Sequence, residues 1–384
     1  MILYDTSLNM NFRDYGIILP ILPDRGKLIL EFMEKNYYPG TRGDSFPYPG
    51  PVLDIRDALV YLNIADRTVI NRDDLIRIHS SDYIASLYDK KGLETALHTS
   101  FELIDSQGRL NRYEPDTAKK PLSELFQIIL AQAGGTWLAC RLALAPGPGF
   151  CYYLGGGMHH ARYDSGSGFC LINDVAIAAA KMCAKTAFSC GSSNNIPRLI
   201  WIIDLDVHMG DGTAELIHFS RQRGELYDPH IPMENDDIKP CILTLSIHMA
   251  HGWPLDSENL AAAEKGRAPL LASDVDIGID AGQENEYTPR LIQGIKELEQ
   301  LSAALYPIPA KPDLVLVVDG ADPYEYDELP SASLLKLSLE QCLERDNYVY
   351  RYLMDRSIPS AWILSGGYGE RAWEPPAYFL QGIR

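Results

Sequence analysis

The chain has 384 residues, of which 46% are hydrophobic, and this is compatible with one large α/β domain. Its 34 Lys and Arg residues against 52 Asp and Glu residues give a formal net charge of -18, which argues against direct binding to nucleic-acid phosphates. The same excess of acidic groups favours a cationic substrate.

The seven cysteines are odd in number and form no CxxC pair, so the sequence predicts neither a zinc ribbon nor a disulfide framework. A reducing compartment, the cytoplasm, is the simplest expectation. The first residues lack a basic start followed by an apolar run, and we expect no signal peptide. Every apolar run is too short to span a bilayer, so no membrane span is predicted.

Residues 1–115 are predicted to be an irregular N-terminal part with rim loops. The pattern indicates a short strand at residues 2–4 and a helix at residues 27–35, followed by a loop rich in Pro, Gly and Tyr at residues 37–51. A Ser or Asp cap within residues 80–82 predicts the start of another helix. Residues 116–384 carry the main motifs, and we expect the whole chain to form a single domain.

From residue 116 onward the pattern becomes helical and then alternates between strands and helices. Residues 121–144 have apolar side chains at helical spacing, interrupted at Gly134 and Gly135. After a short apolar run at residues 150–154, strands are predicted at 199–203, 242–247, 275–279, 314–318 and 361–364, with helices at 173–185, 284–305 and 333–355. Surface loops are predicted at residues 191–195 and 227–237. This order is typical of an α/β domain with a mostly parallel central sheet flanked by helices.

The strand at residues 199–203 leads directly into a cluster of acids and a histidine. Asp204, Asp206 and His208 alternate along the chain, so an extended backbone points them to the same side. Two carboxylates and an imidazole that converge repel one another unless a cation lies between them, and carboxylates crowded at an apolar strand end are costly. A solvated acidic loop is the alternative, and a divalent metal site is the favoured interpretation.

Polar residues also follow other predicted strands, at positions that share one edge of a parallel sheet. Asp322 follows the strand at 314–318 and could complete a zinc site that keeps one position open. Tyr368 follows two glycines, and its phenol could stabilise an oxyanion. His159 and His160 follow a triple glycine and could act as proton carriers. Each residue also has an ordinary alternative role. Asp322 could lie in a solvated acidic loop, Tyr368 could be a packing residue of the core, and His159 and His160 could be surface histidines.

Together these segments resemble the zinc-dependent histone deacetylase family, within the arginase/deacetylase fold. The resemblance is carried, in family order, by residues 79–83, 157–161, 168–174, 204–213, 246–248, 320–322 and 365–368. Residues 121–136 and 365–371 look like the class IV branch and its bacterial relatives. The resemblance implies a single-domain three-layer fold with the active site at the C-terminal ends of the strands.

The resemblance also implies two cation sites. A catalytic zinc ion would be bound by Asp206, His208 and Asp322. A structural monovalent cation, usually potassium in the family, would be bound by Asp204, Asp206, His208, Ser246 and the carbonyl group of Ile247.

Catalytic roles are implied for five side chains. His160 would be the general base for a metal-activated water, and His159 would stabilise the transition state and protonate the leaving amine. Asp204 would pair with and orient His159, and Asp211 would do the same for His160. Tyr368 would polarise the amide carbonyl together with the metal.

The expected reaction is hydrolysis of the Nε-acyl amide of lysine, acetyl or longer, through a tetrahedral intermediate. Gly168, Phe169 and Trp253 match a channel that clasps the aliphatic part of the acylated side chain. Polyamine-preferring relatives carry a glutamate at the position of Leu329, so this sequence favours an acyl-lysine protein or peptide over a small acylated amine. The alternatives are an acetylpolyamine amidohydrolase, a catalytically silent acyl-lysine-binding protein and an arginase-like binuclear manganese hydrolase.

Overall fold

The computed structural model describes residues 1–5, 11–36, 52–64, 69–184, 196–226, 239–255, 270–306 and 311–383. These residues form one eight-stranded sheet in which every paired strand is parallel to its neighbour, in the order β2-β1-β3-β8-β7-β4-β5-β6. The strands are β1 (Ile2–Leu3), β2 (Val52–Leu53), β3 (Phe150–Tyr153), β4 (Ile200–Asp204), β5 (Ile242–Met249), β6 (Val275–Ile279), β7 (Leu314–Asp319) and β8 (Ser360–Leu364). The predicted parallel α/β sheet is confirmed.

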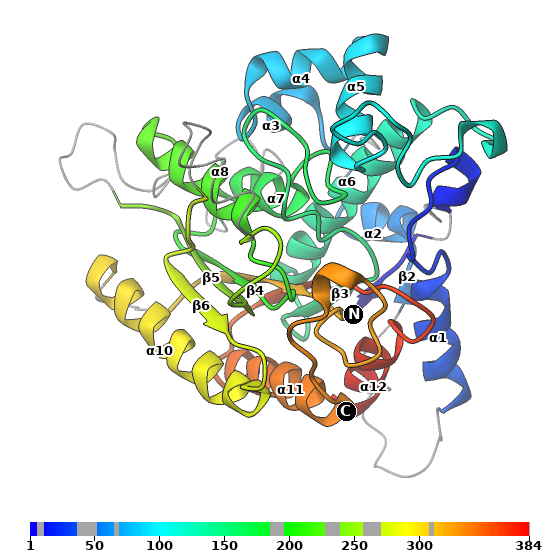
Figure 1. Ribbon diagram of the computed structural model, residues 1–384. Helices are drawn as coiled ribbons and strands as arrows, with labels where there is room; N and C mark the ends of the chain where they lie inside the picture. The colour runs from blue at the N-terminus through cyan, green and yellow to red at the C-terminus, as the bar shows by residue number, and fades with distance from the viewer. Residues whose placement is uncertain are drawn as a thin grey trace.

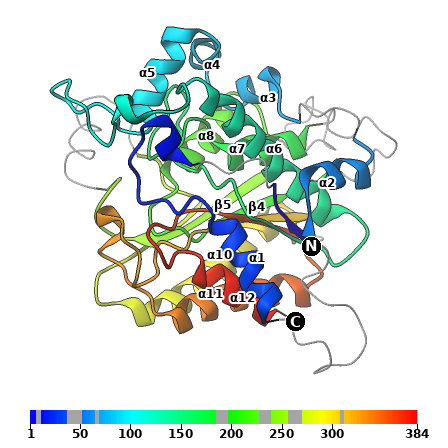
Figure 2. The same ribbon diagram turned by 90° about the vertical axis from the view of Figure 1, so that its right-hand side faces the viewer.

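Helices cover both faces of the sheet and complete three layers (Figure 1, Figure 2). One layer contains α2 (Ile55–Tyr61), α3 (Arg72–Ile76), α4 (Ser81–Leu87), α5 (Lys90–Ser100), α6 (Glu124–Leu144), α7 (Asp174–Cys183) and α8 (Asp211–Gln222). The opposite layer contains α1 (Arg25–Lys35), α10 (Tyr287–Leu305), α11 (Leu339–Asp355) and α12 (Glu374–Gly382). Within the described ranges, no helix is both long and apolar enough to cross a membrane.

Side chains of the central strands alternate between two apolar cores. Ile200 and Ile202 of β4 belong to the core that contains the buried residues of α6 and α7. Trp201 and Ile203 belong to the core that contains those of α10 and α11. All of β4 is buried, because a strand with helices on both faces has no solvated side. The strand ends are therefore held from both faces.

The first 115 residues are more regular than the sequence predicts. They contain α1 to α5, and β1 and β2 extend the sheet at one edge. β2, α2 and α3 are too short to carry much periodic signal, whereas the 11-residue α5 is a helix that the sequence prediction misses. The predicted helix start is confirmed, because the Ser80 side chain accepts the N–H of Tyr83. The loops predicted at residues 37–51, 191–195 and 227–237 lie outside the described residues.

Packing and capping explain two differences between the predicted and the observed helices. α6 runs without a break through Gly134 and Gly135, where the sequence predicts an interruption. A Cβ atom at Gly135 would overlap the ring of Tyr153, so this glycine permits close packing of helix on strand. α11 begins at Leu339 rather than at residue 333, because Ser338 caps it in a reciprocal capping box with Gln341.

The carboxyl ends of β4, β5, β7 and β8 meet at one edge of the sheet. Asp204 is in register with Ser246 of β5 and Val318 of β7, and Asp319 is in register with Leu364 of β8. The loops that follow these strands carry most of the residues singled out in the sequence. The topology thus brings segments far apart in the chain to one place, as predicted.

Candidate active site

Three buried side chains from two loops converge at this edge of the sheet. Asp206 and His208 follow β4, and Asp322 follows β7. Nδ1 of His208 lies 3.2 Å from Oδ1 of Asp206 and 3.1 Å from Oδ2 of Asp322. One donor atom from each residue lies within 4.8 Å of the others. The structure therefore brings together the three residues expected to bind zinc.

The donor set fits a divalent metal ion. Burial and the neighbouring Asp206 carboxylate raise the pKa of Asp322 to about 6. Burial opposes the charge of His208, but the carboxylates of Asp206 and Asp322 outweigh it and raise the imidazole pKa to about 9. A cation where these atoms converge would balance the charges. Two carboxylates and one imidazole are ligands that zinc accepts, with a fourth position open.

His159 and His160 lie beside this cluster, in the loop after β3. Nδ1 of His159 is 2.7 Å from Oδ2 of Asp204, and Nδ1 of His160 is 2.9 Å from Oδ1 of Asp211. The two ring centroids are 3.9 Å apart. Since each Nδ1 is paired with a carboxylate, each Nε2 is left for the site, and Nε2 of His159 is 3.7 Å from Oδ1 of Asp206. Each imidazole has the aspartate partner expected from the sequence.

The two imidazoles have opposite electrostatic environments. Burial opposes the charge of His159, yet Asp204 and Asp206 outweigh it and raise the pKa to about 10. Burial and the adjacent His159 charge lower the pKa of His160 to about 4, against the effect of Asp211. At neutral pH His159 is therefore protonated and His160 is neutral. Such a split separates an acid from a base within one site.

The glycine-rich loop after β8 binds the cluster and carries Tyr368. The Ser365 hydroxyl and the Gly366 N–H both donate to Oδ2 of Asp206, at 3.1 Å and 3.0 Å. The N–H of Tyr368 donates to Oδ2 of Asp327 at 2.7 Å. Burial and the nearby carboxylates raise the pKa of the Tyr368 phenol well above its usual range, so the hydroxyl remains a hydrogen-bond donor.

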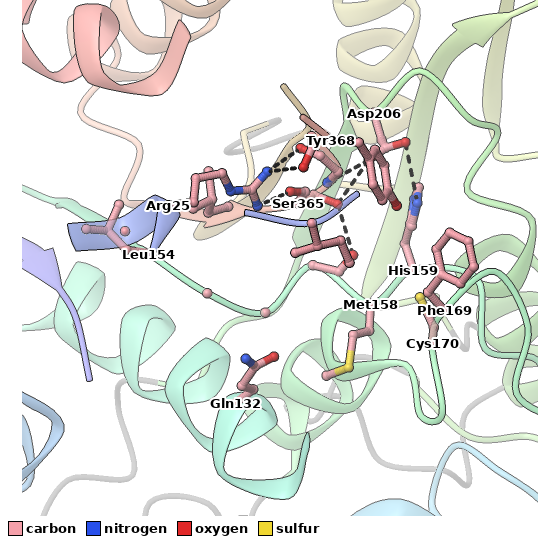
Figure 3. Close-up of a pocket in the computed structure, with 18 of the residues that line it drawn as sticks. Arg25, Gln132, Leu154, Met158, His159, Phe169, Cys170, Asp206, Ser365 and Tyr368 are labelled. Atoms are coloured by element: carbon pink, nitrogen blue, oxygen red, sulfur yellow. Dashed lines mark hydrogen bonds and ion pairs between the residues drawn. The ribbon is translucent and has the colours of Figure 1, made fainter. Parts of the chain in front are cut away.

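Arg25 of α1 is a site residue that the sequence pattern does not indicate. Its guanidinium donates to the carbonyl oxygens of Gly366 at 2.9 Å and Gly367 at 3.2 Å, and also to that of Ser365 (Figure 3). Arg25 and Asp327 thus hold the same loop after β8. Arg25 binds its carbonyl groups, and Asp327 binds the N–H of Tyr368. Neither residue has a local signal, because Arg25 lies in the part that matches no motif and Asp327 lies in an acidic loop.

Two aromatic rings flank the site. Trp253 packs on His160 with a centroid distance of 4.6 Å, and Phe169 faces Tyr368 at 6.1 Å. Gly168 has a φ of 53°, and a Cβ atom there would overlap the Trp253 ring and lie 2.7 Å from the His160 ring. Gly168 and Phe169 line the cavity on the site, whereas Trp253 contacts His160 and is not among the lining residues.

A cavity of about 190 Å³ opens on the cluster. At the site it is lined by His159, His160, Phe169, Asp206, His208 and Tyr368, and it continues past Arg25, Gln132 and Leu154 (Figure 3). Leu329, expected beside the channel, is instead 4% exposed in the apolar core and does not line this cavity.

The residues expected to bind a monovalent cation adjoin the proposed zinc ligands. Oδ1 of Asp204 accepts the N–H of Asp206 at 3.1 Å, and Oγ of Ser246 accepts the N–H of Gly210 at 3.3 Å. The expected set therefore lies on β4, on the loop that follows it and on the neighbouring strand β5. Its members are Asp204, Asp206, His208, Ser246 and Ile247.

His79 supports the backbone of the site histidines through Asn173. Nε2 of His79 accepts the N–H of Asn173 at 3.1 Å, and Nδ1 lies 2.7 Å from the carbonyl oxygen of Arg162. The Asn173 amide nitrogen donates to the carbonyl oxygens of His159 at 3.0 Å and Ala161 at 3.3 Å. Because Nε2 accepts and Nδ1 donates, the His79 ring is neutral.

The stability of the protein is expected to depend on pH through His79. Burial lowers its pKa to about 4, whereas a histidine in an unfolded chain has a pKa of about 6.5. The stabilising effect of the neutral ring is complete above about pH 6.5 and is lost as the pH falls towards 4. Between about pH 7.5 and pH 5.5 the free energy of unfolding should fall by about 1 kcal/mol through this residue. Urea unfolding at the two pH values measures this loss of unfolding free energy. The loss should be about 1 kcal/mol smaller for His79→Gln than for the wild type, and equal losses in the two proteins would contradict a role of His79.

The chain resembles known proteins along most of its length. The family model of the histone deacetylase domain matches residues 23–376. An uncharacterised protein of Picosynechococcus sp. is 28% identical over 75% of this chain and 79% of its own length. Histone deacetylase 6 of Arabidopsis thaliana is 24% identical over 94% of this chain and 67% of its own length. Acetoin utilization protein AcuC of Staphylococcus aureus is 24% identical over 81% of this chain and 67% of its own length.

A solved structure shares the fold of the whole chain. The acetylpolyamine aminohydrolase from Burkholderia pseudomallei aligns with a TM-score of 0.59 and 15% sequence identity, covering 100% of this chain and 98% of that one. The three-layer fold with a central parallel sheet is therefore the arginase/deacetylase fold expected from the sequence.

Proposed function

We propose that this chain, which belongs to the histone deacetylase family, is a zinc-dependent amidohydrolase acting on acylated lysine. The bond cleaved is the Nε-amide that joins lysine to an acetyl or longer acyl group, in a protein or peptide. The observation that carries the proposal is a pair of imidazoles, His159 and His160, each held at Nδ1 by an aspartate, beside three side chains that fit a metal ion. The raised pKa of His159 and the lowered pKa of His160 agree with it. Amide hydrolysis needs a base for the water and an acid for the leaving amine, and this pair offers both.

Water is activated on the side of the site occupied by His160. Zinc bound by Asp206, His208 and Asp322 would supply a Lewis acid that polarises the carbonyl and lowers the pKa of the water. The neutral His160 directs its Nδ1–H to Asp211, which leaves Nε2 to take the proton of the attacking water. The water then adds to the carbonyl carbon.

His159 and Tyr368 respond to the charge that develops during this addition. The Tyr368 phenol donates a hydrogen bond to the carbonyl oxygen as that atom becomes negative. His159, whose Nδ1–H is held by Asp204, gives its Nε2 proton to the lysine nitrogen as the C–N bond breaks. The products are a carboxylate and a free lysine side chain.

Direct attack by water is preferred to a covalent acyl-enzyme. The hydroxyl of Ser365 is hydrogen-bonded to the Gly157 carbonyl at 2.9 Å and to Asp206 at 3.1 Å, with no basic nitrogen among these partners. Burial raises the pKa of the Cys170 thiol and keeps it protonated. Nucleophilic catalysis needs an activated hydroxyl or a thiolate, and neither side chain meets that requirement.

Two other activities are compatible with the same fold. An acetylpolyamine amidohydrolase would be favoured by a carboxylate at position 329 that reached the substrate, whereas this chain has there a leucine buried in the apolar core and away from the cavity. A silent acyl-lysine-binding protein would have no need for both imidazoles and the phenol of Tyr368. The residues present therefore favour an active lysine deacylase.

A panel of peptides carrying acyl-lysine of increasing chain length, together with acetylspermidine, tests the substrate. We expect kcat/KM for the preferred peptide to exceed that for acetylspermidine by at least about tenfold. A preference for the polyamine would contradict the lysine substrate. Purified protein should contain about one zinc ion per chain, and two manganese ions per chain would contradict the mononuclear site.

Several accompanying properties belong to the same proposal. Potassium would bind at the set formed by Asp204, Asp206, His208, Ser246 and Ile247. The chain would act as one catalytic domain in the cytoplasm, which agrees with the free state of the cysteines in the described residues. Direct binding to nucleic acid is not expected at a net charge of -18.

A further inference from the structure

We infer that Arg345 of α11 is a positioning residue that fixes the two loops carrying the zinc ligands relative to each other. The inference rests on the proposed zinc site, but Arg345 itself is not among its ligands. Arg345 is 1% exposed. Its helix belongs to the layer opposite α6 and α7, so it reaches the strand ends from that layer (Figure 1).

One nitrogen of the guanidinium bridges the ends of β4 and β7. Nη1 donates to the carbonyl oxygen of Leu205 and to that of Gly320, each at 3.0 Å. Leu205 directly precedes Asp206, and Gly320 lies two residues before Asp322. The bridge therefore acts on the backbone next to a zinc ligand on each side.

The two peptide groups that Arg345 binds are also fixed at their N–H groups. The N–H of Asp206, in the first of them, donates to Oδ1 of Asp204 at 3.1 Å. The N–H of Ala321, in the second, donates to the carbonyl oxygen of Gly366 at 2.8 Å. A peptide plane held at both its oxygen and its N–H cannot turn freely, so the backbone directions at the ligands are set.

The two segments also touch each other directly. A Cβ atom at Gly320 would lie 2.6 Å from Cα of Asp206 and 2.8 Å from Oδ1 of Asp322. There is no room for a side chain between them. A rotation of either peptide group would consequently change the distance between the two carboxylates.

Arg345 is held in turn by two buried carboxylates. Nη2 donates to Oδ1 of Asp319 at 2.8 Å, and Nε donates to Oδ1 of Asp346 at 2.6 Å. The second oxygen of Asp319 accepts the Tyr152 hydroxyl at 2.6 Å. A planar guanidinium offers donors in fixed directions, which a lysine ammonium cannot reproduce. Buried ion pairs contribute little net stability, so a geometric role accounts better for this cluster.

Loss of the bridge is expected to weaken zinc binding. Groups that orient metal ligands typically change metal affinity by about 10–100-fold when they are removed. We expect Arg345→Met to raise the zinc Kd by at least about tenfold and to lower kcat with little change in KM, since the channel walls are untouched. Arg345→Lys keeps the charge beside Asp319 and Asp346 but loses the bridging geometry, so an intermediate Kd is expected.

Zinc affinity is measured on the metal-stripped 384-residue chain by competition with a chelator of known affinity, and the unfolding midpoint is followed in parallel. Arg221→Met is the matched control. Arg221 donates to Asp274 at 2.7 Å and to the carbonyl oxygen of Ile242, at the other end of the sheet. This control should lower the unfolding midpoint but leave the zinc Kd within about twofold of wild type.

A folded Arg345→Met protein that binds zinc as tightly as wild type would overturn the positioning role. An equal loss of affinity in Arg221→Met would do the same, because the effect would then reflect general stability. If Arg345→Met does not fold, Arg345→Lys decides the question, and a wild-type Kd in that variant counts against the inference. Failure of the wild-type chain to bind zinc would instead refute the proposed function, so the two failures are distinguishable.

Discussion

Replacing His160 with alanine is expected to lower kcat for an acyl-lysine peptide by about two to four orders of magnitude. In the proposed reaction the imidazole of His160 takes the proton of the attacking water, and the carboxylates around His159 raise the pKa of that neighbouring imidazole, which makes it a poorer base. Because His160 is outside the set Asp206, His208 and Asp322, zinc content should stay close to that of the wild type. Steady-state kinetics and metal analysis of the same sample measure both quantities.

His218→Ala is the matched control for this variant. His218 is exposed on α8 and its ring is 2.8 Å from the Gln222 amide, so kcat should be unchanged. Asp211→Asn should give an intermediate loss, since it weakens the contact that orients His160. Full activity of His160→Ala would show that another group acts as the base.

Replacing Tyr368 with phenylalanine is expected to lower kcat by about two to three orders of magnitude. The substitution removes one hydroxyl and leaves the ring that faces Phe169 at 6.1 Å. In the proposed reaction the hydroxyl acts mainly when the carbonyl oxygen becomes negative, so KM should change little. Initial-rate kinetics over a range of peptide concentrations separate the two constants.

Tyr378→Phe removes the same hydroxyl at a remote position and serves as the control. Tyr378 is 38% exposed on α12, and its ring contacts Phe32 at 4.7 Å. This variant should keep wild-type kcat and KM. If Tyr368→Phe raised KM and left kcat unchanged, the phenol would stabilise the bound substrate and the transition state equally, which would contradict a role specific to the transition state.

The strands and the convergence of the ligands are predictable because their signals are local. Apolar runs mark the central strands, and Asp206, His208 and Asp322 stand within a few residues of where those runs end. A parallel sheet then places them at one edge. The chemical roles of these residues remain predictions, which the kinetic experiments above are designed to test.

Other features depend on packing between distant segments, which the sequence pattern does not reveal. Gly134 and Gly135 would weaken an isolated helix, but contact with Tyr153 keeps α6 continuous. Arg25 binds Gly366 and Gly367, which lie 341 and 342 positions further along the chain. Arg345 lies in a helix where a charged residue is expected to be exposed, yet its guanidinium reaches Leu205, 140 positions away.

Ser365 and Gly366 donate hydrogen bonds to Asp206, from which they are separated in the sequence by 159 and 160 residues respectively. Contacts of such long range form slowly, since the intervening chain must first lose much of its conformational freedom. The hydrogen bonds that hold Asp206 from the loop after β8 are thus expected to form only once this last strand has joined the sheet. Zinc would then secure a finished chain by mass action rather than direct its collapse, in contrast to small domains that fold around their metal.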